Sequence, residues 1–163
     1  MAPTNKKRTQ APVIPLKPDY DKATIEYVKH RRSEVVAGVT EEIQERVPII
    51  DDGSSPYHKL EMFTAFAKAR RHLGWTTGPK LFQRFAMHLE GSHATTWDDQ
   101  VTGIAHTVAN FDAALITFKS TMLAGYRHGD QLDYLRSIKK PKDMSPGEFL
   151  LLFRALENHA KSL

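Results

Sequence analysis

The eight histidines are the residues of this chain best suited to metal binding or acid–base catalysis. No His-Glu-x-x-His motif occurs, and His88 and His93 are five residues apart, a spacing that does not place both on one face of a helix. The neighbouring carboxylates Asp98 and Asp99 point to different sides of a predicted helix, so we expect them to face water. The absence of cysteine excludes disulfides, thiol catalysis and every cysteine-based metal site. We therefore predict no metal site.

Motifs that cradle phosphate or present a nucleophile are also missing. The sequence has no G-x-x-x-x-G-K-[ST], no G-x-G-x-x-G and no G-x-S-x-G. The segment Asp51-Asp52-Gly53-Ser54 has a faint similarity to the Asp-Thr-Gly loop of retroviral aspartic proteases, but Asp stands in the Ser/Thr position and a helix start follows. We interpret it as a turn. The sequence thus predicts no enzyme, no cofactor and no small-molecule substrate.

Composition indicates a folded, soluble body. Hydrophobic residues make up 40% and charged residues 26% of the 163 residues, the balance of an average globular protein. No apolar run approaches the roughly 18 residues of a membrane-spanning helix, and the first fifteen residues lack the apolar stretch of a signal peptide. We therefore expect a protein of the cell interior without a membrane span.

Positive charge is concentrated at the N-terminus. Residues 1–32 contain eight Lys or Arg and three acids, whereas the rest of the chain carries 15 basic and 16 acidic residues. Lys6, Lys7 and Arg8 lie within residues 1–18, a proline-rich stretch without apolar periodicity that is predicted to be a disordered arm. Such an arm binds RNA without sequence preference, or an acidic membrane surface, or serves only as a solvated tail.

Helix-start signals recur from residue 54 onward. Ser55-Pro56 predicts a helix that ends near Gly74, and Gly78-Pro79 predicts a second, closed by Gly91. The next three helices are predicted to begin at Ser92, Asn110 and Asp130, and the fifth to end at Pro141. The sixth begins with the capping box Ser145-Pro146-Gly147-Glu148. Ahead of them, residues 23–28 and 43–50 favour short strands, while residues 33–46 are equally compatible with a helix start. The predicted fold is mainly α: about six helices after a short extended or β segment.

The two tryptophans are expected to differ. Trp97 shares a helix face with Ala94, Val101 and Ile104, so we predict that it is buried where the second, third and fourth helices meet. Trp75 follows Gly74 in a link rich in glycine and threonine, and we predict that it is more exposed.

Three motifs carry a resemblance to a known family. Leu89, Gly91, Ala94 and Trp97 stand in an L-x-G-x-A-x-x-W pattern that resembles the signature of the retrotransposon Gag capsid family. A second motif, Phe111, Leu115 and Phe118, is similar to the family's (W/F)-x-x-x-L-x-x-F helix. A third is similar to its S-V-x-E-Y/F-x-x-x-F-x-x-L helix and consists of Ser145, Glu148, Phe149, Phe153 and Leu156. Residues 48–54 resemble the Pro-x-Phe-x-Gly-Ser segment ahead of the first capsid helix, so the resemblance covers about residues 47–163. A single tryptophan where a pair is frequent, and Ile138-Lys139-Lys140 where a Gln often stands, depart from the pattern.

The resemblance implies two helical capsid lobes, an N-terminal one at residues 19–127 and the start of a C-terminal one at 128–163. It further implies a structural Gag protein of a gypsy-like LTR retrotransposon, which associates with itself into cytoplasmic virus-like particles that enclose RNA. The chain stops at Leu163 on the apolar stripe of its last helix. We therefore expect these 163 residues to form small oligomers and a longer protein to form closed shells.

Other functions remain open from the sequence. A domesticated Gag-derived host protein would keep the same motifs, and protease and reverse transcriptase sequence downstream would distinguish an active element from it. A helical nucleic-acid-binding module is a second alternative, with Arg70, Arg71 and His72 as candidate contacts. A small helical enzyme is a distant third.

Overall fold

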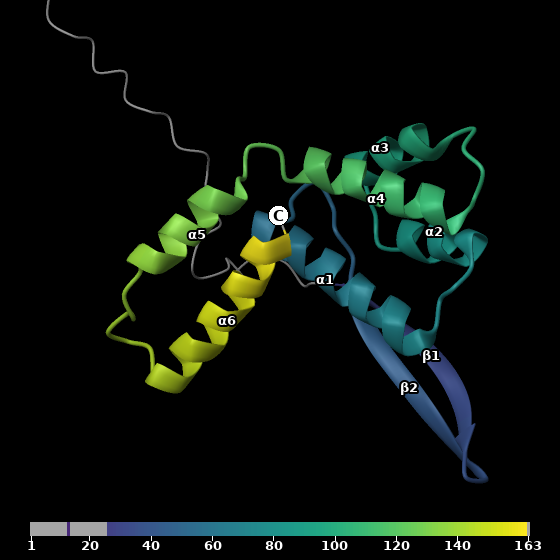
Figure 1. Ribbon diagram of the computed structural model, residues 1–163, viewed down its shortest axis with the longest axis horizontal. Coiled ribbons are helices and arrows are strands. Elements are labelled where there is room, and N and C mark those ends of the chain that lie inside the picture. The colour runs from purple at the N-terminus through teal and green to yellow at the C-terminus, as the bar shows by residue number, and fades with distance from the viewer. Residues whose placement is uncertain (1–12, 14–25, 163) are drawn as a thin grey trace, which may run out of the picture. The chain divides into compact units, whose positions relative to one another are not determined.

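The computed structural model describes residue 13 and residues 26–162, and these are mainly helical (Figure 1). The elements are β1 (Tyr27–Val36), β2 (Val39–Pro48), α1 (Pro56–Leu73), α2 (Gly78–Ala86), α3 (Ser92–Val101), α4 (Val108–Met122), α5 (His128–Ser137) and α6 (Pro146–Ser162). The predicted fold class, six helices after a short β segment, is confirmed. The chain divides into two compact units, Pro18–Leu123 and a second that contains Ala124–Leu163. The predicted arm, with Lys6, Lys7 and Arg8, lies outside the described residues.

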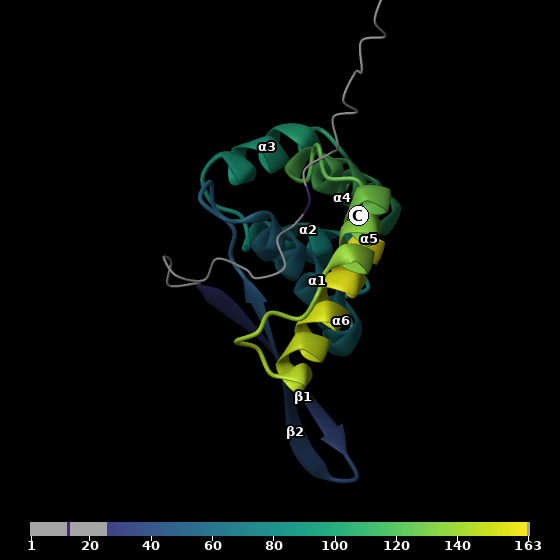
Figure 2. The ribbon, with the colours of Figure 1, turned by 90° about the vertical axis from the view of Figure 1, so that its left-hand side faces the viewer.

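The two strands form one antiparallel hairpin. Tyr27 pairs with Pro48 and Val36 with Val39, without a break in register between them. Ala37 and Gly38 make the turn with φ of 52° and 80°, the left-handed conformation that two-residue hairpin turns need to match strand twist. The alternative of a helix in residues 33–46 is wrong, because continuous cross-strand pairing outweighs the helix propensity of the glutamates in this segment. Figure 2 shows the hairpin extending beyond α1.

Helix α1 is formed as its local sequence predicts. The side chain of Ser55 accepts a hydrogen bond from the backbone N–H of His58 at 3.2 Å, and Pro56 occupies the first turn. Gly74 ends the helix in the left-handed conformation, with its N–H bonded to the carbonyl of Arg70. Ahead of the helix, Asp51 Oδ1 accepts from the N–H of Gly53 at 2.9 Å, which confirms the predicted turn.

The end of α2 and the start of α3 differ from the prediction. Helix α2 ends at Ala86 with Met87 as its C-cap, and Gly91 is the N-cap of α3, not the end of α2. The reason is a bridge to the segment before α1: Ile50 N–H donates to the carbonyl of His88, and Glu90 N–H donates to the carbonyl of Ile50, each at 2.9 Å. This pairing pulls residues 88–90 out of the helix. Ser92 is consequently the first residue of α3 and not its cap.

Helix α4 begins earlier than predicted. Its N-cap is Thr107, whose Oγ1 accepts from the N–H of Asn110 at 3.1 Å, so Asn110 lies within the first turn. The side chain of Asn110 instead donates to the carbonyl of Ala105. Helix α3 ends at Val101, which leaves Ile104 in the loop and outside the apolar face predicted for it.

An aromatic cluster forms the centre of the first unit. Its rings come from α1, α2, α3 and α4 and are Phe63, Phe66, Phe82, Phe85, Trp97, Phe111 and Phe118. Trp97 is 1% exposed at the junction of α2, α3 and α4, as predicted. Trp75, predicted to be more exposed than Trp97, is 5% exposed and therefore also buried, because the turn at Gly74 directs its ring onto Phe66, 5.5 Å away.

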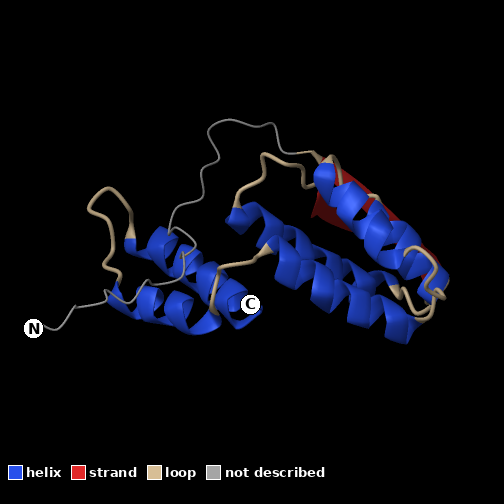
Figure 3. Cartoon of the chain, turned by 90° about the horizontal axis from the view of Figure 1, so that it is seen from above, coloured by secondary structure: helices blue, strands red, loops and turns tan. Residues whose placement is uncertain are grey.

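The second unit contains α5 and α6, which pack against each other (Figure 3). Helix α5 begins at His128, two residues before the predicted Asp130, which lies in its first turn. Leu135 on α5 and Leu156 and Ala160 on α6 are buried. Among the described residues, no helix has the length and apolar content that crossing a membrane requires.

Candidate functional site

The residues of the first motif lie where α2, α3 and the segment before α1 meet. Leu89 is buried and bridges to Ile50, and Ala94 is half-buried on α3. Gly91 has φ of 62°, and a Cβ there would lie 2.9 Å from the carboxylate of Asp52. Only glycine fits this position without strain. The glycine of the motif therefore permits close contact between two segments, and does not end α2.

A polar clasp beside Gly91 holds the start of α3. Asp52 Oδ1 accepts from the backbone N–H of Ser92 at 2.9 Å and also from the Ser92 hydroxyl. Hydrogen bonds from the side chain and then the backbone of Ser92 lower the pKa of Asp52 below its usual value. The carboxylate satisfies an otherwise unpaired N–H of the first helical turn and complements the positive end of the helix dipole.

Trp97 joins the first motif to the second. Its ring lies 4.6 Å from that of Phe85 and 5.3 Å from that of Phe118, both edge to face. Phe111 and Phe118 are fully buried on α4, and Leu115, from the same motif, is half-buried against the cluster. The motif residues that lie apart in sequence thus share one rigid core.

A buried histidine pair fixes the hairpin to this core, and the sequence analysis did not identify it. His30 on β1 and His88 after α2 place their Nε2 atoms 2.8 Å apart, so one ring donates to the other. Burial, followed by the charge of Arg84, lowers the pKa of His30 to about 4. Burial, followed by His30, lowers the pKa of His88 to about 4. Both rings are therefore neutral at physiological pH.

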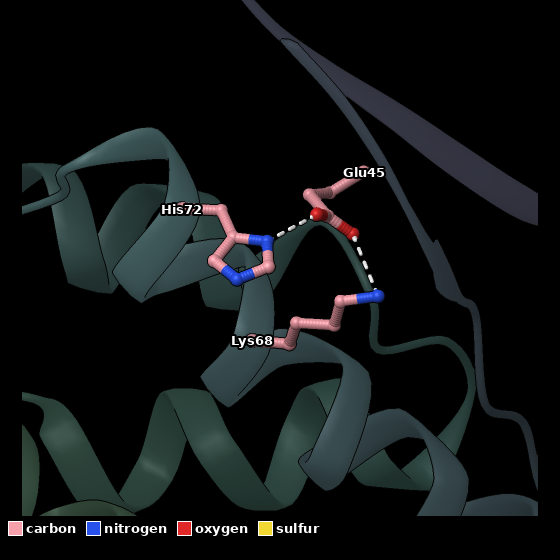
Figure 4. A network of polar contacts seen from close by, with 3 residues as sticks. All are labelled: Glu45, Lys68 and His72. Atoms are coloured by element: carbon pink, nitrogen blue, oxygen red, sulfur yellow. Dashed lines mark hydrogen bonds and ion pairs between the residues drawn. The ribbon is translucent and has the colours of Figure 1, made fainter.

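A second contact fixes the hairpin to α1 (Figure 4). Glu45 on β2 accepts from Nδ1 of His72 at 2.6 Å and pairs with Nζ of Lys68 at 3.9 Å. Glu45 is only 14% exposed in its side chain, so the two donors compensate a carboxylate that has lost most of its water. The half of the hairpin farther from the Ala37-Gly38 turn is thereby held on α1.

Two of the three cations considered for nucleic-acid binding are engaged within the unit. Arg70 Nη1 lies 2.6 Å from Asp112 Oδ1, and its guanidinium lies over the ring of Phe111. His72 binds Glu45, and only Arg71 is exposed and without a contact among the described residues. These three residues do not form a free basic surface.

The third motif lies in the second unit, at the start and along the length of α6. Ser145 Oγ accepts from the N–H of Glu148 at 3.2 Å, which is the predicted cap of α6. The carboxylate of Glu148 is exposed and makes no contact with Ser145 among the described residues, so the reciprocal half of the capping box is not formed. Phe149 and Phe153 are half-buried with ring centres 6.1 Å apart, and Leu156 is fully buried.

No metal-binding constellation joins these residues. In residue 13 and residues 26–162, no three His, Cys, Asp or Glu side chains come together in a way that could hold a metal ion. The buried histidine pair thus has no third ligand, and its hydrogen bond accounts for the Nε2 atoms of both rings. The arrangement is suited to holding the hairpin on the helices of the first unit.

Comparison with known proteins gives no relative. No model of a protein family, no curated protein and no solved structure matches the chain.

Proposed function

We propose that this chain is a structural capsid protein of the Gag type. It associates with itself in the cytoplasm and encloses the RNA of a gypsy-like LTR retrotransposon. Its basic arm contacts the RNA without sequence preference, and its two helical units form the protein contacts of the particle.

One observation carries the proposal. The motif residues that resemble the Gag capsid family come from separate stretches of sequence, and Leu89, Trp97, Phe111 and Phe118 belong to a single buried cluster. Any helical core would bury such apolar residues, so the order and spacing of the motif residues along the chain carry the resemblance, and their shared cluster is consistent with it. Gly91, in the same motif, is the residue that allows the clasp between Asp52 and Ser92.

The arrangement also suits the task. A shell subunit must keep its shape while the same surface contacts repeat from copy to copy. The aromatic cluster, the histidine pair and the Glu45 network hold the helices and the hairpin of the first unit in one arrangement. We therefore interpret the motif residues of this unit as holding its shape.

Sedimentation velocity with and without a single-stranded RNA of mixed sequence tests the proposal. We expect the 163-residue protein to form oligomers whose size increases with protein concentration, and to co-sediment with RNA at low salt. A protein that stays monomeric at all concentrations and leaves the RNA unbound would contradict it.

A variant that lacks residues 1–18 serves as the matched control. It retains both helical units, so we expect self-association to persist while RNA binding is lost. Loss of self-association in this variant would show that the arm, and not the helical units, makes the protein contacts.

A further inference from the structure

We infer that the outer edge of β1 pairs antiparallel with β1 of a second copy, so that two hairpins form a four-stranded sheet across a two-fold axis. This inference names one protein contact of the proposed assembly and so rests on the proposed function. The edge, its exposed side chains and its charge order carry it.

The edge of β1 is long, regular and open. The sheet has only the strands β1 and β2 among the described residues, and α1 packs mainly against β2. The ten residues of β1 pair one-to-one with β2, without a bulge, and contain no proline. One edge of β1 therefore presents backbone N–H and C=O groups that no described strand satisfies, which is a template for a further strand.

The half of the hairpin next to the Ala37-Gly38 turn is also unusually apolar for a surface. Val35 is 71% exposed and Val36 is 47% exposed, and Val39 lies beside Val36 in the pairing. They lie next to the Ala37-Gly38 turn, and the turn end of the hairpin projects beyond α1 (Figures 1 and 2). In an antiparallel pair centred on Ser33, Val35 and Val36 would lie opposite Arg31 and His30 of the second copy, and the added strand would cover part of their apolar surface.

Charge order along β1 selects the antiparallel arrangement. The first half of the strand carries Lys29, Arg31 and Arg32, and the second half carries Glu34 followed by the valines. A parallel pair in register would place each arginine beside its own copy. A two-fold axis at Ser33 instead places Arg32 of each copy opposite Glu34 of the other, and does so twice.

The same arrangement would reduce a repulsion between like charges within each copy. Glu34 lies opposite Glu41 across the hairpin, and like charges in that position destabilise a strand pair. Among the described residues, Arg32 on the same strand, 3.7 Å away, is the ion-pair partner of Glu34. An arginine from the second copy on the open side of Glu34 would neutralise it further.

Disulfide trapping detects this contact directly. Because the protein has no cysteine, any disulfide must form through the introduced one. In Ser33→Cys the two thiols would lie opposite each other, where Cα atoms of paired strands are about 4.5–5.5 Å apart and a disulfide can form. We expect a covalent dimer under mild oxidation. The matched control is Gln44→Cys, which is exposed on β2 on the same face of the hairpin as Ser33. We expect this variant to remain monomeric on non-reducing gels.

A mixture of Arg31→Cys and Val35→Cys proteins fixes the register. With the axis at Ser33, position 31 of one copy lies opposite position 35 of the other, so the mixture should cross-link more than either variant alone. The inference is overturned if Ser33→Cys cross-links no faster than Gln44→Cys. A hairpin that binds a different protein through this edge would give that same result.

Charge exchange provides a second test that does not depend on thiol chemistry. Arg32→Glu and Glu34→Arg each create two like-charge pairs in the dimer, and each should raise its dissociation constant about tenfold. Mixing the two variants restores both attractive pairs, so the mixture should associate as the parent does. Equal association of the mixture and of its separate components would overturn the inference.

These outcomes remain distinguishable from failure of the proposed function. Cross-linked dimers in a protein that never encloses RNA would leave the edge contact standing and refute the capsid role. RNA-containing particles formed by a protein whose Ser33→Cys variant does not cross-link would do the reverse.

Discussion

The two units of this chain begin their helices with equally good local signals and differ in how well they bury them. In the first unit, seven aromatic rings converge, and Trp97 and Phe85 contact rings from neighbouring helices. In the second unit, Phe149 and Phe153 are half-buried and Leu151 is 70% exposed on the same helix. Helix formation is therefore local in both, whereas burial depends on the number of elements available to cover an apolar face.

The difference in burial between the two units distinguishes local helix stability from stability due to packing. A cap and a favourable composition stabilise a helix by about 1 kcal/mol or less per feature, and packing of an amphipathic face supplies most of the rest. We therefore expect the first unit to unfold at higher denaturant concentration than the second. Both tryptophans, Trp75 and Trp97, lie in the first unit, so tryptophan fluorescence reports that unit alone.

The largest expected effect comes from the centre of the first unit. Trp97→Ala removes a ring that contacts four phenylalanines and leaves a cavity, so we expect the unfolding free energy to fall by ~3–5 kcal/mol. Urea denaturation followed by circular dichroism measures it, because the variant retains only Trp75. Ile116→Ala, on the exposed side of α4, is the matched control, with an expected change within about 0.5 kcal/mol. A Trp97→Ala protein as stable as the control would show that the cluster is not the core.

The histidine pair predicts that acid weakens the first unit. The pKa of His30 and His88 is about 4 in the folded protein and about 6.5 when unfolded, so the unfolded chain takes up protons first. Stability should be full above pH 6.5 and fall as the pH decreases toward 4, by at most about 1.4 kcal/mol per pH unit for each ring. Burial also lowers the pKa of His93, which acts in the same direction.

Fluorescence-detected urea denaturation at pH 7, 6, 5 and 4 measures this dependence. NMR titration of the two rings gives an independent measurement, since the pair should remain neutral at pH 6. Ordinary titration of either ring near pH 6.5 in the folded protein would contradict the buried hydrogen-bonded pair.

Trp97 was predictable from sequence, and the histidine pair was not. The caps at Ser55, Gly74 and Ser145 depend on residues within four positions, and so does the apolar face of Trp97, so short-range chemistry suffices for them. His30 and His88 are 58 residues apart and meet only after the hairpin folds back on the helical body. No local pattern marks such a pair.

The sequence errors share one physical cause. Trp75 was expected to be more exposed than Trp97 because its neighbours are small and polar, but the Gly74 turn directs it inward and both rings are buried. Gly91 was expected to end α2, and the backbone pairing of Ile50 with His88 and Glu90 ended that helix earlier. The helix propensity of residues 33–46 was outweighed by the pairing of β1 with β2. In each case a tertiary contact decided between two local conformations.

Two cap substitutions test whether the two units unfold independently. Thr107→Ala on α4 and Ser145→Ala on α6 each remove a side-chain acceptor from a helix start, at an expected loss of about 1 kcal/mol. In the first unit this loss should appear in the tryptophan-detected denaturation curve. In the second it should appear as faster hydrogen exchange in residues 146–162 with an unchanged tryptophan curve. An equal shift of that curve by both variants would mean that the units unfold together.

A smaller effect is expected from the N-terminal arm. Replacing Lys6, Lys7 and Arg8 with Gln should leave both denaturation curves unchanged, and should weaken RNA binding at low salt. If the three cations contact phosphates, the slope of log affinity against log salt should decrease by about 2 for single-stranded RNA. Fluorescence anisotropy over a salt series measures it. An unchanged slope would place the RNA contacts on the helical units.

Nuclease protection of RNA in particles tests the capsid role most directly. The complete reading frame that encodes these 163 residues would be expressed in cells, and fast-sedimenting material would be treated with ribonuclease and imaged by negative-stain electron microscopy. The proposed function predicts closed particles that protect RNA until the protein is denatured. A protein that sediments only as monomers or dimers, with all RNA digested, would contradict it.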